Sequence, residues 1–260
     1  MKFHGNQGSG VCGQAYFEKR SLWDIRDYTY AGWQLYYSEY TDGLLKGCDI
    51  RAEDGQLVIG KGMLKFHDFI YLMMEEERVD YQPKNRWQVL KAEFSEDETN
   101  LDYKAYRVRF FLDEEMELGE NQIEMCRFYL REGSTLRDSY KNFADMSTEY
   151  DTVNLICATV AGIGEKTLHP LVVKQFCEEL WNMEEKDQFD FGFCNLVWNT
   201  QGRVERKVIA AYLSNKMKKA VVAKIMSYDN QMVYEKLENI VDNMGKFKKE
   251  KVNTRVIIVD

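Results

Sequence analysis

The residues that could carry catalysis or bind a metal are few and widely spaced. The 260-residue chain has three histidines, at positions 4, 67 and 169, and they form no HExxH or other closely spaced pair. His169 and Cys177 lie eight residues apart, which is about 12 Å along a helix and too far for a nucleophile to contact its base. We therefore expect no bound metal and only core or surface roles for the histidines.

The cysteines indicate a reducing environment rather than a disulfide framework. The six cysteines lie at positions 12, 48, 126, 157, 177 and 194, and no two form a CxxC motif. A chain of this length, with 45% hydrophobic residues, can build a core without covalent staples. Cys157 and Cys177 have apolar neighbours and are expected to be small core residues.

Two glycine pairs approach known phosphate-binding motifs but do not complete them. Gly162 and Gly164 would begin a dinucleotide fingerprint, yet Thr167 stands where the third glycine belongs. Gly60-Lys61-Gly62 lacks the spacing of a P-loop. The acidic runs at 75–77 and 113–115 are interpreted as solvated surface. We expect no catalytic centre and no organic cofactor, so the protein is predicted not to be an enzyme.

The overall charge argues against a nucleic-acid-binding protein. The chain has 35 basic and 43 acidic residues, a net charge of −8, whereas binding to phosphate backbones needs a basic surface. The basic tract 246–251 is interpreted as a solvated helix end, with nucleic-acid contact as the alternative. No apolar run approaches the roughly 18 residues of a membrane helix, and residues 1–13 do not resemble a signal peptide. We expect no membrane insertion, no signal peptide and a cytoplasmic site of synthesis.

Aromatic residues are concentrated near the N-terminus. Residues 30–40 contain five of them at helical spacing, and Thr29 could cap the helix while Gly43 could end it. Tyr36 and Tyr37 would point about 100° apart, so one core cannot easily take them all. We predict a subunit interface comprising Trp23, Tyr28, Tyr30, Trp33, Tyr36, Tyr37 and Tyr40. The alternative is that the stripe packs inside the chain's own core.

The hydrophobic pattern predicts an α+β fold with an antiparallel, β-rich N-terminal part and a mostly helical C-terminal part. Asp54-Gly55 is a strong hairpin turn between two alternating segments. Further strands are expected at 63–72, with a turn at His67-Asp68, near 87–90, and at 154–160. The runs 103–112 and 121–131 are expected to pair as a hairpin. Short strands are also predicted at 11–17 and 255–259.

Helical periodicity dominates after Gly164. Helices are predicted over 168–183 with Thr167 as the cap, over 203–217, and over 232–244 with Gly245 at the end. Residues 220–226 fit a helix or a strand. We predict three parts, namely an arm and aromatic helix (1–42), a β-rich module (43–150) and a mostly helical module (151–260).

The segment Gly43 to Leu72 has a distinctive arrangement of glycine and apolar residues. Its matching positions are Gly43, Gly47, Ile50, Leu57, Ile59, Gly62, Phe69, Ile70 and Tyr71. This pattern resembles a segment that recurs in tail and baseplate proteins of bacteriophages and contractile injection systems. His67-Asp68 departs from it, since family members often have a glycine before the last strand. The resemblance covers about 30 of the 260 residues.

The resemblance implies a structural component of a tail-like particle, in the baseplate or fibre-attachment region. Such a protein would form homo- and hetero-oligomers with other particle subunits and would assemble in the bacterial cytoplasm before joining the particle. The alternative is an enzyme or small-ligand-binding protein with an unrecognised site. Oligomerisation or partner binding would favour the first hypothesis.

Overall fold

The computed structural model describes the backbone of residues 19–97, 105–218 and 221–253. The chain divides into two compact units, Met1–Ser38 and Glu39–Asp260. The predicted strands at 11–17 and 255–259 lie outside the described residues. The three-part division at residues 42 and 150 stays a prediction.

The first unit contributes one described helix, α1, over Lys19–Tyr36. The predicted aromatic helix is therefore present, but it begins earlier and ends sooner than the pattern indicated. Thr29 lies inside α1 and is not its N-cap, which corrects that prediction. Residues 19–29 contain no proline or glycine, so nothing in the sequence stops the helix from extending toward the N-terminus.

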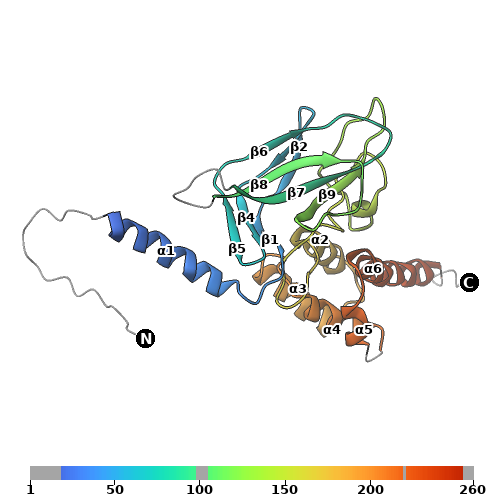
Figure 1. The fold of residues 1–260 in the computed structure, drawn as a ribbon. Coiled ribbons are helices and arrows are strands. Elements are labelled where there is room, and N and C mark those ends of the chain that lie inside the picture. The colour runs from blue at the N-terminus through green and yellow to red at the C-terminus, as the bar shows by residue number, and fades with distance from the viewer. Residues whose placement is uncertain (1–18, 98–104, 219–220, 254–260) are drawn as a thin grey trace, which may run out of the picture. The chain divides into compact units, whose positions relative to one another are not determined.

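The second unit contains three antiparallel sheets and five α-helices among its described residues (Figure 1). The strands are β1 (Gly43–Gly47), β2 (Ile50–Glu53), β3 (Gln56–Ile59), β4 (Gly62–Phe66), β5 (Phe69–Met73), β6 (Glu77–Asp80), β7 (Trp87–Asp97), β8 (Ala105–Asp113) and β9 (Gln122–Tyr129). The sheets have the strand orders β1-β4-β5, β2-β3-β6 and β8-β7-β9. Since the helices follow the strands in sequence, the α+β prediction is confirmed.

The predicted hairpin at Asp54-Gly55 joins β2 to β3. Glu53 pairs with Gln56, which leaves a two-residue loop. Asp54 and Gly55 both have positive φ, at 48° and 80°, as a type I′ turn requires. The alternating residues before and after this dipeptide thus become two paired strands, as the sequence predicted.

Other glycines between residues 43 and 72 allow the backbones of β1 and β4 to approach each other closely. A side chain at Gly62 would place its Cβ 2.4 Å from the amide nitrogen of Cys48 and 2.5 Å from its sulfur. Gly62 pairs with Gly47 where β4 meets β1. The following turn at His67-Asp68 joins β4 to β5, as predicted, and His67 has a φ of 51°. Any larger residue at position 62 would push these two strands apart.

Two strand predictions are corrected by the structure. The strands β8 and β9 do not form a hairpin with each other, because β7 lies between them and pairs with both. Residues 154–160 do not form a strand. Asn154 makes only an isolated bridge to Arg127, and Val160 makes only isolated bridges to Leu44 and Thr167. The apolar side chains of residues 154–160 fill the core, whereas the backbone groups of this segment bond to several different partners.

The helices of the second unit are α2 (Pro170–Trp181), α3 (Gln188–Asn199), α4 (Arg206–Lys216), α5 (Val222–Met226) and α6 (Asn230–Asn253). The predicted helices over 168–183, 203–217 and 232–244 are confirmed, and the ambiguous stretch 220–226 contains α5. Thr167 does not cap α2, because His169 takes that role with its Nδ1 3.2 Å from the amide of Leu171. Gly245 does not end α6, which continues to Asn253.

The helix α3 was not predicted from the sequence. Phe189, Phe191 and Phe193 alternate with other residues and so resemble a strand. The deciding signal is a capping box, in which Asp187 and Asp190 each accept a hydrogen bond from the other's amide.

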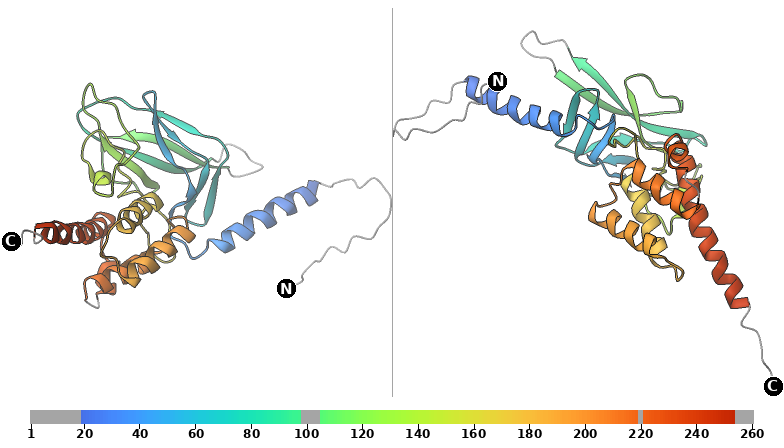
Figure 2. Two further views of the ribbon diagram at one scale, coloured as in Figure 1. Left: turned by 180° about the vertical axis from the view of Figure 1, so that it is seen from behind. Right: turned by 90° about the horizontal axis from the view of Figure 1, so that it is seen from below.

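One continuous core links the sheets to the helices of the second unit. It includes Leu57 and Leu90 from strands and Phe176, Leu213 and Tyr234 from helices. Figure 2 shows α2–α6 grouped beside the strands in both views. Cys177 is buried as predicted, whereas Cys157 is only half-buried.

Candidate functional site

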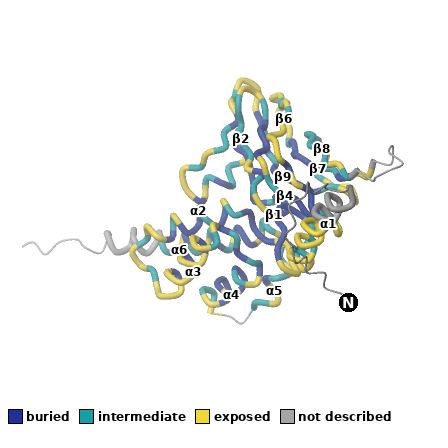
Figure 3. The backbone as a smooth tube through the Cα atoms, turned by 90° about the vertical axis from the view of Figure 1, so that its left-hand side faces the viewer, coloured by how far each residue is buried: buried dark blue, intermediate teal, exposed yellow. Residues whose placement is uncertain are grey.

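The described part of α1 exposes large apolar side chains. The exposed fraction is 76% for Tyr28, 78% for Leu35 and 73% for Tyr36, and Tyr30 and Trp33 are also exposed. Figure 3 colours this end of the helix mainly as exposed. Such a run of exposed aromatic and aliphatic groups is typical of a surface that another chain covers.

The structure separates the seven predicted interface residues into two groups. The first group consists of α1 and the residue after it, with Trp23, Tyr28, Tyr30, Trp33 and Tyr36 on the helix and Tyr37 directly following it. The side chain of Trp23 lies outside the described part of the structure. The rings of Tyr36 and Tyr37 meet edge to face with centroids 4.9 Å apart. Tyr40 belongs instead to the second unit, where its carbonyl accepts a hydrogen bond from Lys65 Nζ at 2.7 Å. Tyr40 is therefore fixed by the fold of that unit.

A second exposed aromatic group lies on α2 and α3 and was missed in the sequence. The rings of Phe191 and Trp198 both pack against Trp181, with centroids 5.3 and 4.7 Å from it. All three side chains remain 39% exposed. Recognising α3 as a helix would have revealed this group, because residues 191 and 198 are two turns apart on one face.

The second unit also has a cavity of about 910 Å³ with a mixed polar and apolar lining. Its lining residues are Thr41, residues from β7 and β9, residues from segments 147–166 and 226–231, and the first residue of α4. The charged side chains among them are Arg127, Glu149, Glu165, Lys166, Arg206 and Asp229. None of these residues was predicted as a site, because they are far apart in the sequence and match no motif.

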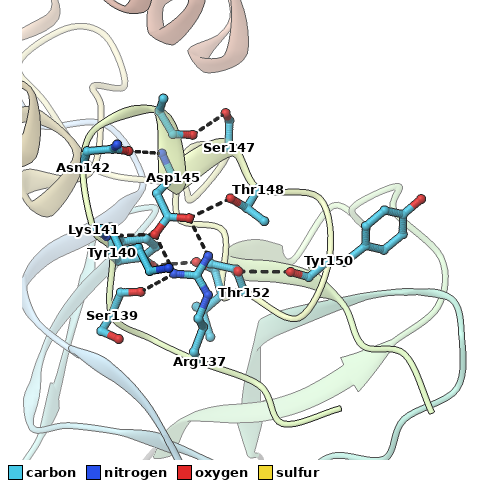
Figure 4. Close-up of polar contacts among 12 residues, drawn as sticks. Arg137, Ser139, Tyr140, Lys141, Asn142, Asp145, Ser147, Thr148, Tyr150 and Thr152 are labelled. Atoms are coloured by element: carbon cyan, nitrogen blue, oxygen red, sulfur yellow. Dashed lines mark hydrogen bonds and ion pairs between the residues drawn. The ribbon is translucent and has the colours of Figure 1, made fainter. Parts of the chain in front are cut away.

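The loop that carries Ser147 and Glu149 to the cavity is held by an ion pair (Figure 4). The Arg137 guanidinium donates to both carboxylate oxygens of Asp145 at 2.6 and 2.5 Å. Asp145 also accepts bonds from the Lys141 amide and the Thr148 hydroxyl. Arg137 is the main reason that the pKa of Asp145 lies below its usual value. The short helix η1 (Ala144–Ser147) is thus fixed in place beside the cavity.

The two arginines that line the cavity differ in their charge partners. Arg127 forms two hydrogen bonds of 2.6 Å with the carboxylate of Glu124, which raises the pKa of Arg127. Arg206 is 95% buried, and among the described residues it forms no ion pair. Burial lowers the pKa of the Arg206 guanidinium. Arg206 therefore carries a buried charge that this chain does not neutralise by direct contact.

Among the described residues, no group of three or more histidine, cysteine, aspartate or glutamate side chains is arranged to hold a metal ion. No described helix combines the length and the apolar character that a membrane crossing needs.

Comparison with known proteins gives little guidance. No protein-family model matches the chain, and no curated protein matches it. Among solved structures, the crystal structure of TssK is similar with a TM-score of 0.36 and 9% sequence identity, over 92% of this chain and 69% of the other. A TM-score this low does not establish a common fold, so it assigns no function here.

Proposed function

We propose that the protein is a structural, non-enzymatic component of a phage-tail-like or contractile injection particle, in the baseplate or fibre-attachment region. The resemblance of residues 43–72 to tail and baseplate proteins supports this proposal. The glycines of that segment have structural roles, since Gly47 and Gly62 meet at the β1–β4 contact and Gly55 forms the β2–β3 turn. The proposed protein is made in the bacterial cytoplasm and joins other subunits there.

The observation that carries the proposal is the exposed aromatic surface of α1. Tyr28, Leu35 and Tyr36 are each more than 70% exposed, and the helix belongs to a compact unit distinct from the rest of the chain. Covering one such side chain at the centre of an interface contributes about 2 kcal/mol to binding. We therefore assign α1 the role of contacting a neighbouring subunit of the particle.

Incorporation into the particle tests this role directly. Particles would be purified by sedimentation from cells that produce either the parent or the Trp33→Ala/Tyr37→Ala variant. We expect the parent to co-sediment with the particle and the variant to remain in the soluble fraction. The variant Met74→Ser is the control, because Met74 is 67% exposed but lies outside α1, and it should be incorporated like the parent.

Circular dichroism and thermal melting of both variants would show that the second unit is folded. Equal incorporation of the folded Trp33→Ala/Tyr37→Ala variant would contradict the assignment of α1. Absence of the parent protein from the particle would contradict the proposed function itself. The genes beside this one offer a further check, since sheath, tube and tape-measure genes are expected there.

A second candidate, small-ligand binding, is favoured by the 910 Å³ cavity and by its buried arginine. The cavity is large enough for a small molecule. Ligand binding and assembly do not exclude each other, because α1 and the cavity belong to different units.

A further inference from the structure

Arg206 is held firmly at the wall of the cavity but has one nitrogen without a partner. Its Nε donates to the carbonyl of Lys166 at 3.0 Å, and its Nη2 donates to the side-chain oxygen of Asn230. Its Nη1 is buried and has no hydrogen-bond partner in the described part of the chain. A buried charged donor without an acceptor is costly, typically by 1–3 kcal/mol or more.

Two helices begin at the cavity. Arg206 is the first residue of α4, and Asn230 is the first residue of α6. Both residues line the cavity. The amide groups in the first turn of a helix favour an anion, and α6, with 24 residues, is the longest described helix. The exposed Lys166 is a further cation of the cavity lining.

Three carboxylates also line the cavity, so its charge is mixed rather than uniformly positive. Asp229 is engaged in capping α6, since its carboxylate accepts the Met232 amide at 2.7 Å. Glu149 and Glu165 are the other two. None of the three forms an ion pair with Arg206. This arrangement suits a small polar ligand with one anionic group more than a polyanion.

We propose that the cavity binds a small polar ligand through an oxyanion, a phosphate or a carboxylate, that accepts a hydrogen bond from Arg206 Nη1. The oxyanion neutralises the buried guanidinium, and the N-terminus of α4, which has no side-chain cap, adds to the attraction. Charge-assisted hydrogen bonds of this kind are about twice as strong as neutral ones. The inference concerns the second unit alone and does not depend on the tail-particle role.

Isothermal titration calorimetry of the full chain with inorganic phosphate and, separately, with acetate tests the site. Sodium chloride at equal ionic strength is the reference, because it separates a specific site from general screening. We expect saturable binding of at least one of the two anions. Binding of phosphate alone would indicate a phosphorylated ligand, and binding of acetate alone would indicate a carboxylate ligand.

Three variants identify the anchoring residue. Arg206→Lys removes the unpaired Nη1 donor and should weaken binding at least tenfold. Lys166→Met changes an exposed side chain and should weaken binding a few-fold without affecting folding. Arg109→Lys makes the same substitution at a 69% exposed arginine of β8, a strand that contributes no residue to the cavity lining, and should bind like the parent.

Absence of saturable binding by both anions would overturn the proposal. Equal affinities for the parent, Arg206→Lys and Lys166→Met would also overturn it. If circular dichroism shows that Arg206→Lys does not fold, the Lys166→Met variant decides. The proposed site includes the positive charge of Lys166, so an unchanged affinity in this variant would contradict the proposal.

Discussion

The aromatic residues of α1 and those of the helical part of the second unit have similar chemistry and opposite surroundings. Phe143, Phe176 and Tyr234 are fully buried, with the Phe143 ring 5.3 and 4.6 Å from the rings of Phe176 and Tyr234. Tyr28 and Tyr36 on α1 are more than 70% exposed. The first group stabilises the fold, whereas the second is available to a partner. Aromatic content alone therefore does not distinguish a core from an interface.

Truncation of a buried ring should have the largest effect on stability. Phe176→Ala removes a fully buried side chain that contacts Phe143, Phe193 and Tyr212. We expect the free energy of unfolding to fall by about 3–5 kcal/mol, because the variant loses apolar contacts and leaves a cavity. Urea denaturation followed by circular dichroism measures this change. A loss below about 1 kcal/mol would contradict the assignment of Phe176 to the core.

A pH titration should reveal the buried histidine of the second unit. Burial lowers the pKa of His169 to about 4 from the ordinary 6.5. The unfolded chain therefore binds a proton at a higher pH than the folded chain, so stability falls as the pH drops from 6.5 to 4. The corresponding loss is about 3 kcal/mol.

The variant His169→Asn provides the control for this titration. Asparagine can still cap α2 through its side-chain oxygen, but it does not titrate. The pH dependence of the free energy of unfolding should therefore be weaker in this variant between pH 6.5 and 4. Parallel curves for the two proteins would show that His169 is not the group responsible.

The β2–β3 turn should show a smaller effect that arises from the backbone. Gly55 has a φ of 80°, and a Cβ atom there would contact nothing within 4 Å. Gly55→Ala should therefore cost about 1 kcal/mol from conformational strain alone. Thermal melting measures the change, and Gly133→Ala, at a φ of 77° with equally open space, is a matched comparison outside the hairpin. An unchanged melting temperature of the Gly55→Ala variant would contradict the positive φ angle of Gly55 in the turn.

The smallest effect on stability is expected on α1. Tyr28→Ala/Tyr36→Ala removes two exposed rings from a helix, and alanine favours helices more than tyrosine does. The free energy of unfolding should change by less than about 0.5 kcal/mol. A loss comparable to that of Phe176→Ala would mean that α1 is part of the folded core.

The sequence predicted most reliably where local chemistry decides the structure. Asp54-Gly55 can adopt the two positive φ angles of a tight turn, so the hairpin followed from two residues. The pairing of β8 and β9 could not be predicted in this way, because only the folded chain places β7 between them. The apolar run 154–160 misled for a related reason, since its apolar character is required by the core and not by a sheet.

The candidate sites were predictable to different degrees. The aromatic spacing around Trp33 predicted a helix whose rings either form an interface or pack in the chain's own core, and it did not show that Tyr40 belongs to another unit. Arg206 gave no signal, because a single arginine at a helix start is common on protein surfaces. Its burial, its contacts with Lys166 and Asn230, and its unpaired nitrogen appear only when segments far apart in sequence come together.

The molar mass of the purified protein in solution tests the central claim most directly. Size-exclusion chromatography with light scattering would compare the parent with Tyr28→Ala/Tyr36→Ala and with the exposed control Met74→Ser. We predict that the parent and the control form an assembly larger than the 30.7 kDa chain, alone or with a co-expressed particle subunit. The α1 variant should elute as a folded 30.7 kDa monomer. A monomeric parent that binds no particle subunit, or an α1 variant that assembles like the parent, would contradict the account.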